Sequence, residues 1–303
     1  MKIIKTYSPG KCILTGEHSV VYGEPAVAAA LSQGVVVSMT DGELDPSHPF
    51  ADFIQHVFAI FNDKHQSKLP QIHQDLSQIK VDLTFQIPIG SGLGSSAALA
   101  HALIKALYDW FELEYDAPTL FELVQVSEKL VHGNPSGVDA ATVINGGLNF
   151  FQKKQQQFQI KPIPSKFKQP LELLLIQSGE PTETTGEMVQ LVADRLQSDP
   201  SLATTIKEIG RISRQLSQQL QNGRLEPALL TQNHQLLAQL GVVGTKAATM
   251  IQEIEAVGGA AKISGAGGIK TGSGIILVYA ADINQVQQLA AEKGWESFPL
   301  LLS

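Results

Sequence analysis

The chain has 303 residues, which is enough for one large domain or two ordinary ones with a sizeable core. Its composition, 43% hydrophobic and 17% charged, is typical of a soluble globular protein, and a net charge of −7 without a basic cluster disfavours nucleic acid as a partner. The single cysteine, Cys12, excludes an internal disulfide and a cysteine-rich metal site, and we expect its thiol to be buried. No signal peptide or bilayer-spanning run is expected, so the predicted location is cytoplasmic, without a membrane partner.

The first half of the chain is predicted to alternate strands with amphipathic helices. Apolar alternation and β-branched residues predict strands at Ile3–Thr15 with a break at Ser8–Gly10, and at Val35–Ser38, Val81–Ile87 and Leu148–Phe151. Helical spacing predicts helices at Phe53–Phe61, Ser95–Phe111, Pro118–Leu130 and Asp139–Val143. The polar stretches 41–49 and 63–78 are predicted to be a loop and a linker.

The second half is predicted to be mainly helical between short strands. A Gln/Lys-rich hairpin or linker at 153–168 precedes it, and we place a domain boundary near its end. Strands are predicted at Leu171–Ile176, Ala260–Ser264, Ser273–Tyr279 and near Phe298. Helices are predicted at Glu187–Gln197, Leu202–Gln221, Pro227–Leu240, Thr245–Val257 and Asp282–Lys293. The stripe Ile206, Ile209, Ile212, Leu216 and Leu220 predicts a face that packs into the core.

The other elements are organised around the glycine-rich segment PIGSGLGSSAA, Pro88 to Ala98. It lies between an alternating strand and a long helix. Its glycines permit positive φ, and the helix end offers N–H groups to an anion, most obviously a phosphate chain. Ser95 and Ser96 stand where helix N-cap residues are preferred, and their hydroxyls could reach a metal ion. The alternative is a tight turn that needs glycine for steric reasons alone.

Two common phosphate-binding motifs do not fit this segment. A Walker A loop requires a lysine before the hydroxyl, and none is present. The third glycine of a dinucleotide fingerprint would fall at Ser95. The preceding strand Val81–Ile87 alternates with period two, which suits an antiparallel strand with one exposed face rather than a buried parallel strand. The segment therefore predicts a phosphate cradle of another kind.

Further polar segments interrupt the core pattern at Ser8–His18, Glu128–Asp139 and Ser264–Gly268, and such breaks are where function is expected. Asp139 begins a short helix, where its carboxylate either complements the helix dipole or faces a reacting hydroxyl. Glu128 is either a solvated helix residue or, together with Ser95 or Ser96, a ligand of Mg²⁺.

The first polar segment contains Lys11, Glu17 and His18, and each of them has a structural and a functional interpretation. Lys11 is either exposed or adjacent to Asp139, where it would favour the ionised carboxylate. Glu17 and His18 follow a glycine in a break between strands, where they are either structural or in contact with substrate. The sequence contains no HxxxH or CxxC metal spacing and no GxSxG elbow, which disfavours a zinc site and a serine hydrolase.

Together these segments resemble the motifs of the GHMP superfamily of small-molecule kinases. Residues 8–23, SPGK through GEHSVVYG, are similar to the first family motif in the form found in its mevalonate-phosphorylating branch, and they lack the GEHTDY-like continuation of the galactokinases. PIGSGLGSSAA resembles the second motif, and HGNPSGVD at 132–139 resembles the segment that carries the catalytic aspartate. KISGAGG at 262–268 resembles the third motif. The segments follow the family order and span most of the chain.

The resemblance implies a two-domain α+β fold with the active site in the cleft between the domains. Residues 1–167 would form a ribosomal-S5-like α/β domain with the ATP and catalytic motifs, and residues 168–303 a ferredoxin-like α+β domain. It also implies ATP and Mg²⁺ as cofactors, mevalonate as the small-molecule substrate, phosphorylation of its C5 hydroxyl as the reaction, and a homodimer.

The resemblance further implies a role for each matching residue. Lys11 and Asp139 would be the catalytic pair, and Ser96 and Glu128 would ligate Mg²⁺. The substrate-binding residues would be Glu17, His18, Ser136 and Thr184. The nucleotide phosphates would lie against Pro88, Gly90, Ser91, Gly92, Leu93, Gly94, Ser95, Ser96, Gly265, Ala266, Gly267 and Gly268.

The sequence departs from the family pattern in two places. Residues 269–274 lengthen the loop of the third motif, where Lys270 could supply a charge, and Ala140 stands where an asparagine often follows the aspartate. Two alternative functions also stay open. One is a sister kinase that acts on phosphomevalonate, homoserine or a sugar. The other is a binding protein with the same fold and no catalysis.

Overall fold

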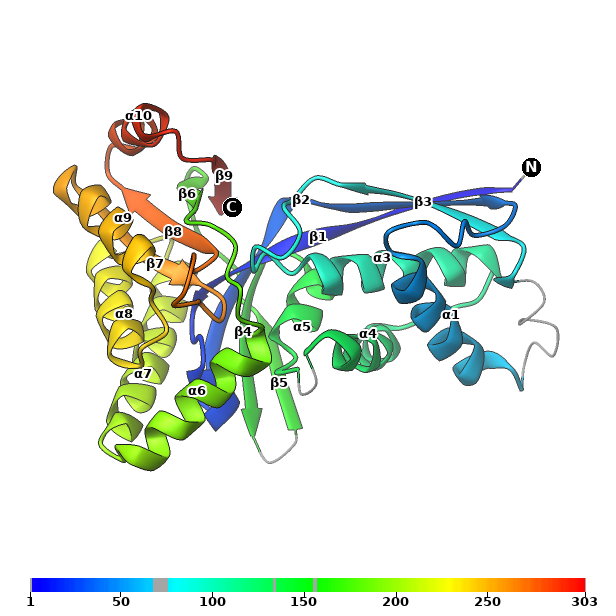
Figure 1. Cartoon of the computed structure of the whole chain (residues 1–303), viewed down its shortest axis with the longest axis horizontal. Helices are drawn as coiled ribbons and strands as arrows, with labels where there is room; N and C mark the ends of the chain where they lie inside the picture. Colours follow the sequence, from blue (N-terminus) through cyan, green and yellow to red (C-terminus); the bar gives the residue numbers. More distant parts are fainter. Residues whose placement is uncertain (1, 68–75, 133–134, 155–156, 303) are drawn as a thin grey trace.

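The structure of the protein is a computed structural model that describes residues 2–67, 76–132, 135–154 and 157–302. Each half of the chain forms a sheet covered by helices, and the two halves lie side by side along the long axis of the molecule (Figure 1). The predicted α+β class is confirmed. The domain boundary at residues 167 and 168 stays a prediction, and it falls between the last strand of the first sheet and the first strand of the second.

The first sheet is antiparallel. In the described part of the chain it has five strands: β1 (Ile3–Thr15), β2 (Ala26–Asp41), β3 (Ile79–Phe85), β4 (Leu148–Lys154) and β5 (Gln157–Pro162). A short 3-10 helix, η1 (Ser19–Tyr22), follows β1. The order is β1-β2-β4-β5, and β3 also pairs with β2. The antiparallel pairing of β3 confirms the prediction from its alternation, and the antiparallel pairing of β4 with β5 favours a hairpin over a linker for the first part of 153–168.

Strands β1 and β2 are longer than the sequence predicts. β1 continues through Ser8–Gly10, and its pairing with β2 shifts register between Pro9 and Lys11. Pro9 cannot donate to the ladder, and a bulge is where a strand tolerates proline. Opposite this bulge stands Gly34, where a Cβ would lie 2.0 Å from the Ser8 carbonyl oxygen. The close approach at a glycine therefore allows β2 to run unbroken over Ala26–Asp41.

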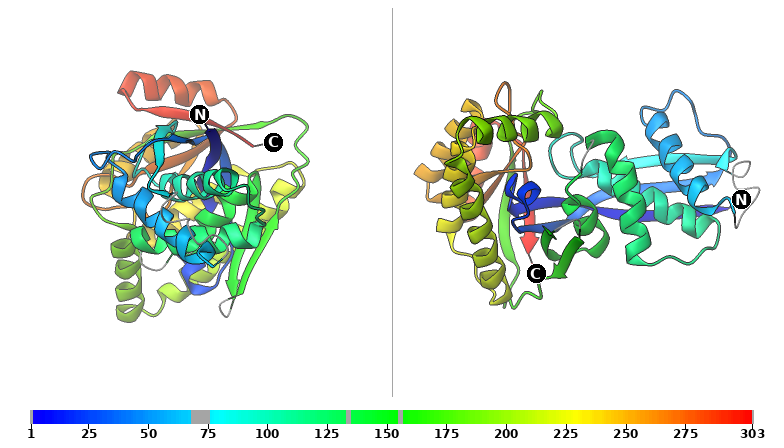
Figure 2. Two further views of the ribbon diagram at one scale, coloured as in Figure 1. Left: turned by 90° about the vertical axis from the view of Figure 1, so that its right-hand side faces the viewer. Right: turned by 90° about the horizontal axis from the view of Figure 1, so that it is seen from below.

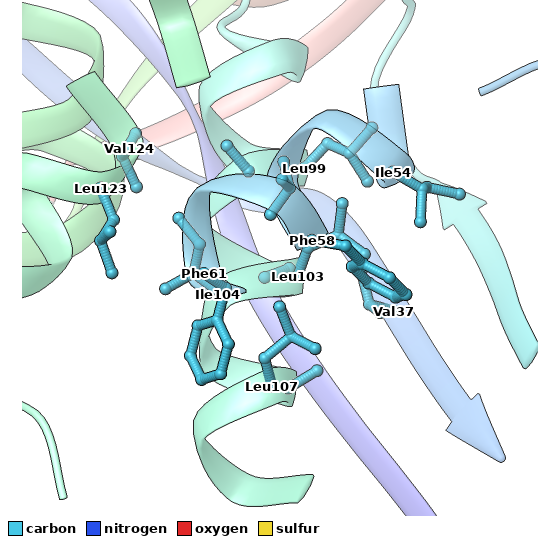
Figure 3. Packing of buried hydrophobic residues seen from close by; sticks show 14 of the residues in the cluster. Val37, Ile54, Phe58, Phe61, Leu99, Leu103, Ile104, Leu107, Leu123 and Val124 are labelled. Carbon is cyan, nitrogen blue, oxygen red and sulfur yellow. The ribbon is translucent and has the colours of Figure 1, made fainter. Parts of the chain in front are cut away.

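One face of this sheet is covered by helices α1 (Ala51–His65), α3 (Ser95–Trp110), α4 (Ala117–His132) and α5 (Val138–Asn145) (Figure 1). Helix α3 contacts β1, β2 and the other three helices, so its N-terminal end is firmly placed. Figure 3 shows the apolar core that results, with side chains from β2, α1, α3 and α4: Val37, Ile54, Phe58, Phe61, Leu99, Leu103, Ile104, Leu107, Leu123 and Val124.

The second sheet contains β6 (Leu171–Gln177), β7 (Gly259–Ser264), β8 (Ile275–Ala280) and β9 (Ser297–Leu302), all antiparallel, in the order β7-β8-β6-β9. This is the strand order of a ferredoxin-like domain. Between β6 and β7 the chain inserts α6 (Thr185–Ser198), α7 (Leu202–Gln221), α8 (Pro227–Gln239) and α9 (Thr245–Ala256). Helix α10 (Ile283–Lys293) connects β8 to β9. Figure 2 shows the inserted helices grouped at one end of the molecule.

An apolar cluster joins the two halves. It contains Leu14 and Ala29 from the first sheet, Leu175 and Leu277 from the second, and Leu216 from α7, all buried. Apolar packing therefore fixes the relative placement of the halves. The predicted core stripe of α7 is buried at each of its positions: Ile206, Ile209, Ile212, Leu216 and Leu220. None of the helices in the described ranges combines the length with the apolar character that crossing a bilayer requires.

Candidate active site

The polar segments singled out from the sequence meet at one cleft, which has residues of both halves in its walls. Its volume is about 750 Å³. The predicted site residues that line it are Lys11, Glu17, His18, Gly90, Ser91, Gly92, Gly94, Ser95, Ser96, Glu128, Ser136, Asp139, Thr184, Gly265, Ala266 and Gly267. Pro88, Leu93 and Gly268 are not among the residues that line it. The Pro88 and Leu93 carbonyls accept from the Ser91 hydroxyl and the Lys11 amide, respectively, and therefore shape the loop from within.

The N-terminal end of α3 faces the cleft. Gly90, Gly92 and Gly94 have φ of 73°, 86° and 71°, a conformation that favours glycine. Gly94 is the N-cap of α3 and no side chain caps the helix, so the expectation that Ser95 or Ser96 is the cap is wrong. They occupy the first helical positions instead. First-turn N–H groups lack intrahelical partners and carry the positive end of the helix dipole, as an anion site requires.

Lys11 and Asp139 form an ion pair in the cleft. Lys11 Nζ lies 3.1 Å from Asp139 Oδ1, and the side chains are 4% and 27% exposed. The alternative of an exposed lysine is therefore excluded. The bulge at Pro9 turns Lys11 toward the glycine loop, where its amide donates to the Leu93 carbonyl at 2.8 Å. A Cβ at Gly94 would lie 2.7 Å from Lys11 Cγ, so a glycine is needed for this contact.

Glu128 is a buried carboxylate next to this pair. It lies on α4 and is 1% exposed, which excludes the alternative of a solvated helix residue. Burial, together with the charge of Asp139, raises the pKa of Glu128 to about 8, against the opposing effects of a hydrogen bond from Ser96 and the charge of Lys11. One buried lysine thus faces two carboxylates, and this site can accept a further cation.

Glu17 and His18 are tied to the second half of the chain. The Glu17 carboxylate pairs with the ammonium of Lys262 on β7, and its other oxygen accepts from Asn233 Nδ2 at 3.3 Å. His18 Nε2 lies 2.9 Å from the Ala266 carbonyl oxygen, and burial lowers the pKa of the imidazole. Both residues line the cleft, but the Glu17 carboxylate is occupied by partners within the protein.

Ser136 and Thr184 line the cleft from different halves of the chain. The Ser136 hydroxyl accepts from the Val138 amide at 3.4 Å at the start of α5. Thr184 is the N-cap of α6, and it forms a reciprocal capping box with Glu187. The Thr184 hydroxyl therefore caps α6 where this helix begins at the cleft.

The lengthened third loop packs against the loop that precedes α6. The Glu183 carboxylate accepts from the amides of Ile269 and Lys270 at 3.2 and 3.1 Å, and Thr271 Oγ1 donates to the Glu180 carbonyl at 2.7 Å. Lys270 is exposed and does not line the cleft. The added residues thus brace the third loop against the α6 loop.

Sequence reasoning missed Lys262, Asn233, Glu183 and Gln125 as residues of this region. Lys262 could have been recognised from the sequence, because a lysine inside an otherwise apolar strand is unusual and is buried only when it is paired. Gln125 lines the cleft one helical turn before Glu128, and its buried side-chain oxygen has no partner among the described residues. Nothing in the local sequence distinguishes Asn233, Glu183 or Gln125 from ordinary polar residues.

A glycine loop at a helix end, a lysine–aspartate pair and a buried glutamate meet between the two sheets, which is the arrangement that the resemblance to the GHMP kinases predicts. The family model described as "GHMP kinases N terminal domain" matches residues 52–147. The crystal structure of L. major mevalonate kinase in complex with R-mevalonate superposes with a TM-score of 0.79 and 26% identity, over 98% of this chain and 95% of that one.

Similarity to curated proteins identifies the branch of the GHMP kinases to which the chain belongs. The mevalonate kinase of Archaeoglobus fulgidus is 32% identical over 86% of this chain and 88% of its own length. That of Pyrococcus furiosus is 31% identical over 88% of this chain and 87% of its own. The chain belongs to the mevalonate kinases.

Proposed function

We propose that the cleft transfers the γ-phosphoryl group of ATP to the C5 hydroxyl of mevalonate, and that the Lys11–Asp139 pair carries the reaction. The 3.1 Å contact between these two side chains is the observation on which the proposal depends. Phosphoryl transfer requires mainly positioning of the reactants and neutralisation of charge. The pair supplies a proton acceptor and a fixed positive charge at one place.

The two members of the pair have separate tasks. Asp139 either accepts the proton of the substrate hydroxyl or orients that hydroxyl while charge develops on it. Lys11 pairs with the carboxylate and stabilises negative charge on the attacking oxygen. The phosphates of ATP lie along the glycine loop and the N-terminal end of α3. The third loop approaches them because its Gly265 lies close to Gly92.

Mg²⁺ fits the donor set of Glu128 and Ser96. The Glu128 carboxylate is withdrawn from water and lies near a second carboxylate, so a divalent cation would relieve the unfavourable free energy of its ionisation. When bound, Mg²⁺ neutralises charge on the phosphate oxygens. Glu128 and Ser96 would hold it together with those oxygens.

The charges of the cleft favour an acceptor without a phosphate group. Among the described residues that line the cleft, Lys11 is the only lysine or arginine. Phosphomevalonate carries additional negative charge and would need further basic groups. His18, Ser136 and Thr184 are the proposed contacts of mevalonate, and Glu17 belongs to the same wall.

Release of ADP with Mg-ATP tests the proposal on a panel of mevalonate, phosphomevalonate, homoserine and galactose, with a control that lacks an acceptor. Turnover is expected on mevalonate. Turnover on another acceptor instead would refute the assignment of the acceptor pocket but leave the phosphoryl-transfer chemistry in place. ATP binding without turnover on any of them would favour a binding protein.

A homodimer and a cytoplasmic location are also proposed, on the resemblance to the family. Light scattering after size-exclusion chromatography distinguishes the 32.6 kDa monomer from a dimer of twice that mass. A mass that stays at the monomer value over the working concentration range would contradict the dimer.

A further inference from the structure

The turn that carries Glu17 and His18 has an unfavourable backbone conformation. His18 has φ of 57° and ψ of −44°, and among the described residues only it and Glu112 have positive φ without being glycine. The preceding Gly16 has φ of 106°, and a Cβ there would lie 2.4 Å from Ala26 Cα. Such conformations persist only where the surroundings hold them. The contacts that hold this turn therefore decide how the cleft wall is shaped.

The turn has backbone hydrogen bonds of its own, such as that from the Val20 amide to the Gly16 carbonyl at 3.1 Å, and the side chains of Glu17 and His18 are held by the other half of the chain, on β7 and the loop that follows it. Lys262 binds the Glu17 carboxylate, and the Ala266 carbonyl accepts from His18 Nε2 at 2.9 Å. Because a carbonyl oxygen only accepts, the Nε2 atom of His18 carries the proton, and Nδ1 of the neutral ring is left as an acceptor. Ser264, which lies between Lys262 and Ala266, also holds β1. Its hydroxyl accepts from the Ile13 amide at 3.0 Å and donates to the Ile13 carbonyl at 3.1 Å.

Lys262 is the central group of this network. Its side chain is fully buried, and its ammonium donates to Glu17, to the Ile13 carbonyl at 3.2 Å and to the Ile263 carbonyl at 2.7 Å. An ammonium has three donors, so all are used within the protein. Asn233 from α8 holds the second oxygen of Glu17. Lys262 does not line the cleft, so it acts on the substrate only through Glu17 and its neighbours.

We propose that Lys262 is a positioning residue that holds the Glu17–His18 turn, and thereby shapes the acceptor side of the cleft. In this arrangement the Glu17 carboxylate serves mainly to lock the turn to β7. On the phosphate side, the glycine loop is held by the Lys11 amide and by the packing of α3, contacts that do not involve Lys262. This inference rests on the proposed function, in which the Glu17–His18 wall faces the acceptor. It predicts that loss of Lys262 raises the KM for mevalonate and leaves the KM for ATP nearly unchanged.

The experiment compares Lys262→Met, Glu17→Gln and the double variant with the wild-type enzyme. Removing one partner of a buried ion pair leaves an uncompensated charge, whereas removing both leaves a neutral pair, so the double variant should have the highest Tm of the three. In Lys262→Met and in the double variant, the KM for mevalonate is expected to rise about tenfold or more, since small misplacements near a reacting centre are costly. The KM for ATP should stay within about twofold.

A matched control separates positioning from simple destabilisation. Thr205 on α7 is buried and bonds Gln239 at 3.2 Å, away from the cleft lining. Thr205→Val should lower Tm and the amount of active enzyme without changing either KM. If Lys262→Met and the double variant behave in the same way as this control, the positioning role is refuted.

A second readout does not depend on turnover. In ¹⁵N-histidine NMR spectra, with His18→Asn used for assignment, the wild-type His18 ring should show the Nε2–H form. Loss of Lys262 should shift it toward a mixture of tautomers, and an unchanged spectrum would contradict the inference. If the wild-type enzyme phosphorylates a different acceptor of the panel, the proposed substrate fails, and the KM comparison made with that acceptor still decides the role of Lys262.

Discussion

Replacing Glu128 with glutamine should stabilise the metal-free protein in alkaline solution. The pKa of Glu128 is raised from 4.5 to about 8, chiefly by burial. For a group whose pKa is raised on folding, the stabilising contribution is complete below the pKa of the unfolded state, 4.5, and is lost as the pH rises through the folded value. Glutamine has the shape of the neutral acid and does not ionise, so the variant avoids this loss.

The magnitude follows from the separation of the two pKa values. At roughly 1.4 kcal/mol per pKa unit, ionising Glu128 in the folded state lowers the free energy of unfolding by about 5 kcal/mol. Most of this loss, about 4 kcal/mol, falls between pH 5 and 8.5. For a chain of 303 residues, this loss corresponds to a difference of about 6 °C between the Tm of the variant and that of the wild type at pH 8.5.

The assay is thermal unfolding of both proteins with EDTA and without nucleotide. Near pH 5 the Tm values should nearly coincide, and near pH 8.5 the variant should unfold at the higher temperature. Parallel curves of Tm against pH for the two proteins would show that Glu128 ionises normally in the folded protein, and would refute the reasoning. Addition of Mg²⁺ with a non-hydrolysable ATP analogue should give the wild type the higher Tm at alkaline pH, because its Glu128 carboxylate then gains the proposed cation.

Three further outcomes are expected. Asp139→Ala should reduce kcat by roughly 10²–10⁴-fold, the usual scale for a general base, and near-normal turnover in a folded variant would remove Asp139 from the mechanism. Gly94→Ala should weaken ATP binding and lower Tm, because φ of 71° disfavours alanine and the added methyl group meets Lys11 at 2.7 Å; an unchanged Kd for ATP would contradict the proposed placement of the phosphates. Cys12 is fully buried, and burial raises the pKa of its thiol, so iodoacetamide should modify it only after denaturation; rapid labelling of the native protein would show that this part of β1 opens readily.

Local patterns in the sequence determined much of the fold. The apolar stripe of α7 predicted a helix over Leu202–Gln221, and the structure has that helix with the same ends. The alternation before the glycine loop predicted an antiparallel strand, which β3 forms with β2. Both features depend on residues within a few positions of one another, so the periodicity of the chain suffices to predict them.

Local rules failed where a distant segment decides the conformation. Pro9 and Gly10 predict a break in the first strand, but the strand continues because Gly34 on β2 allows the backbones to approach. Ser95 is a preferred cap residue, but Gly94 is the cap, since the loop must lie against Lys11 at a positive φ. In each case the packing partner is remote in the sequence.

In the site, too, the sequence determines some features and the tertiary structure determines others. Its residue types and the order of its motifs were readable from the sequence, and they sufficed to nominate Lys11, Asp139 and Glu128. Only the tertiary structure buries Glu128 beside Asp139, and only the tertiary structure brings Lys262 to Glu17 across 245 positions of the chain. Burial and ion pairing depend on what surrounds a group in space, and the packing of the two halves against each other sets those surroundings.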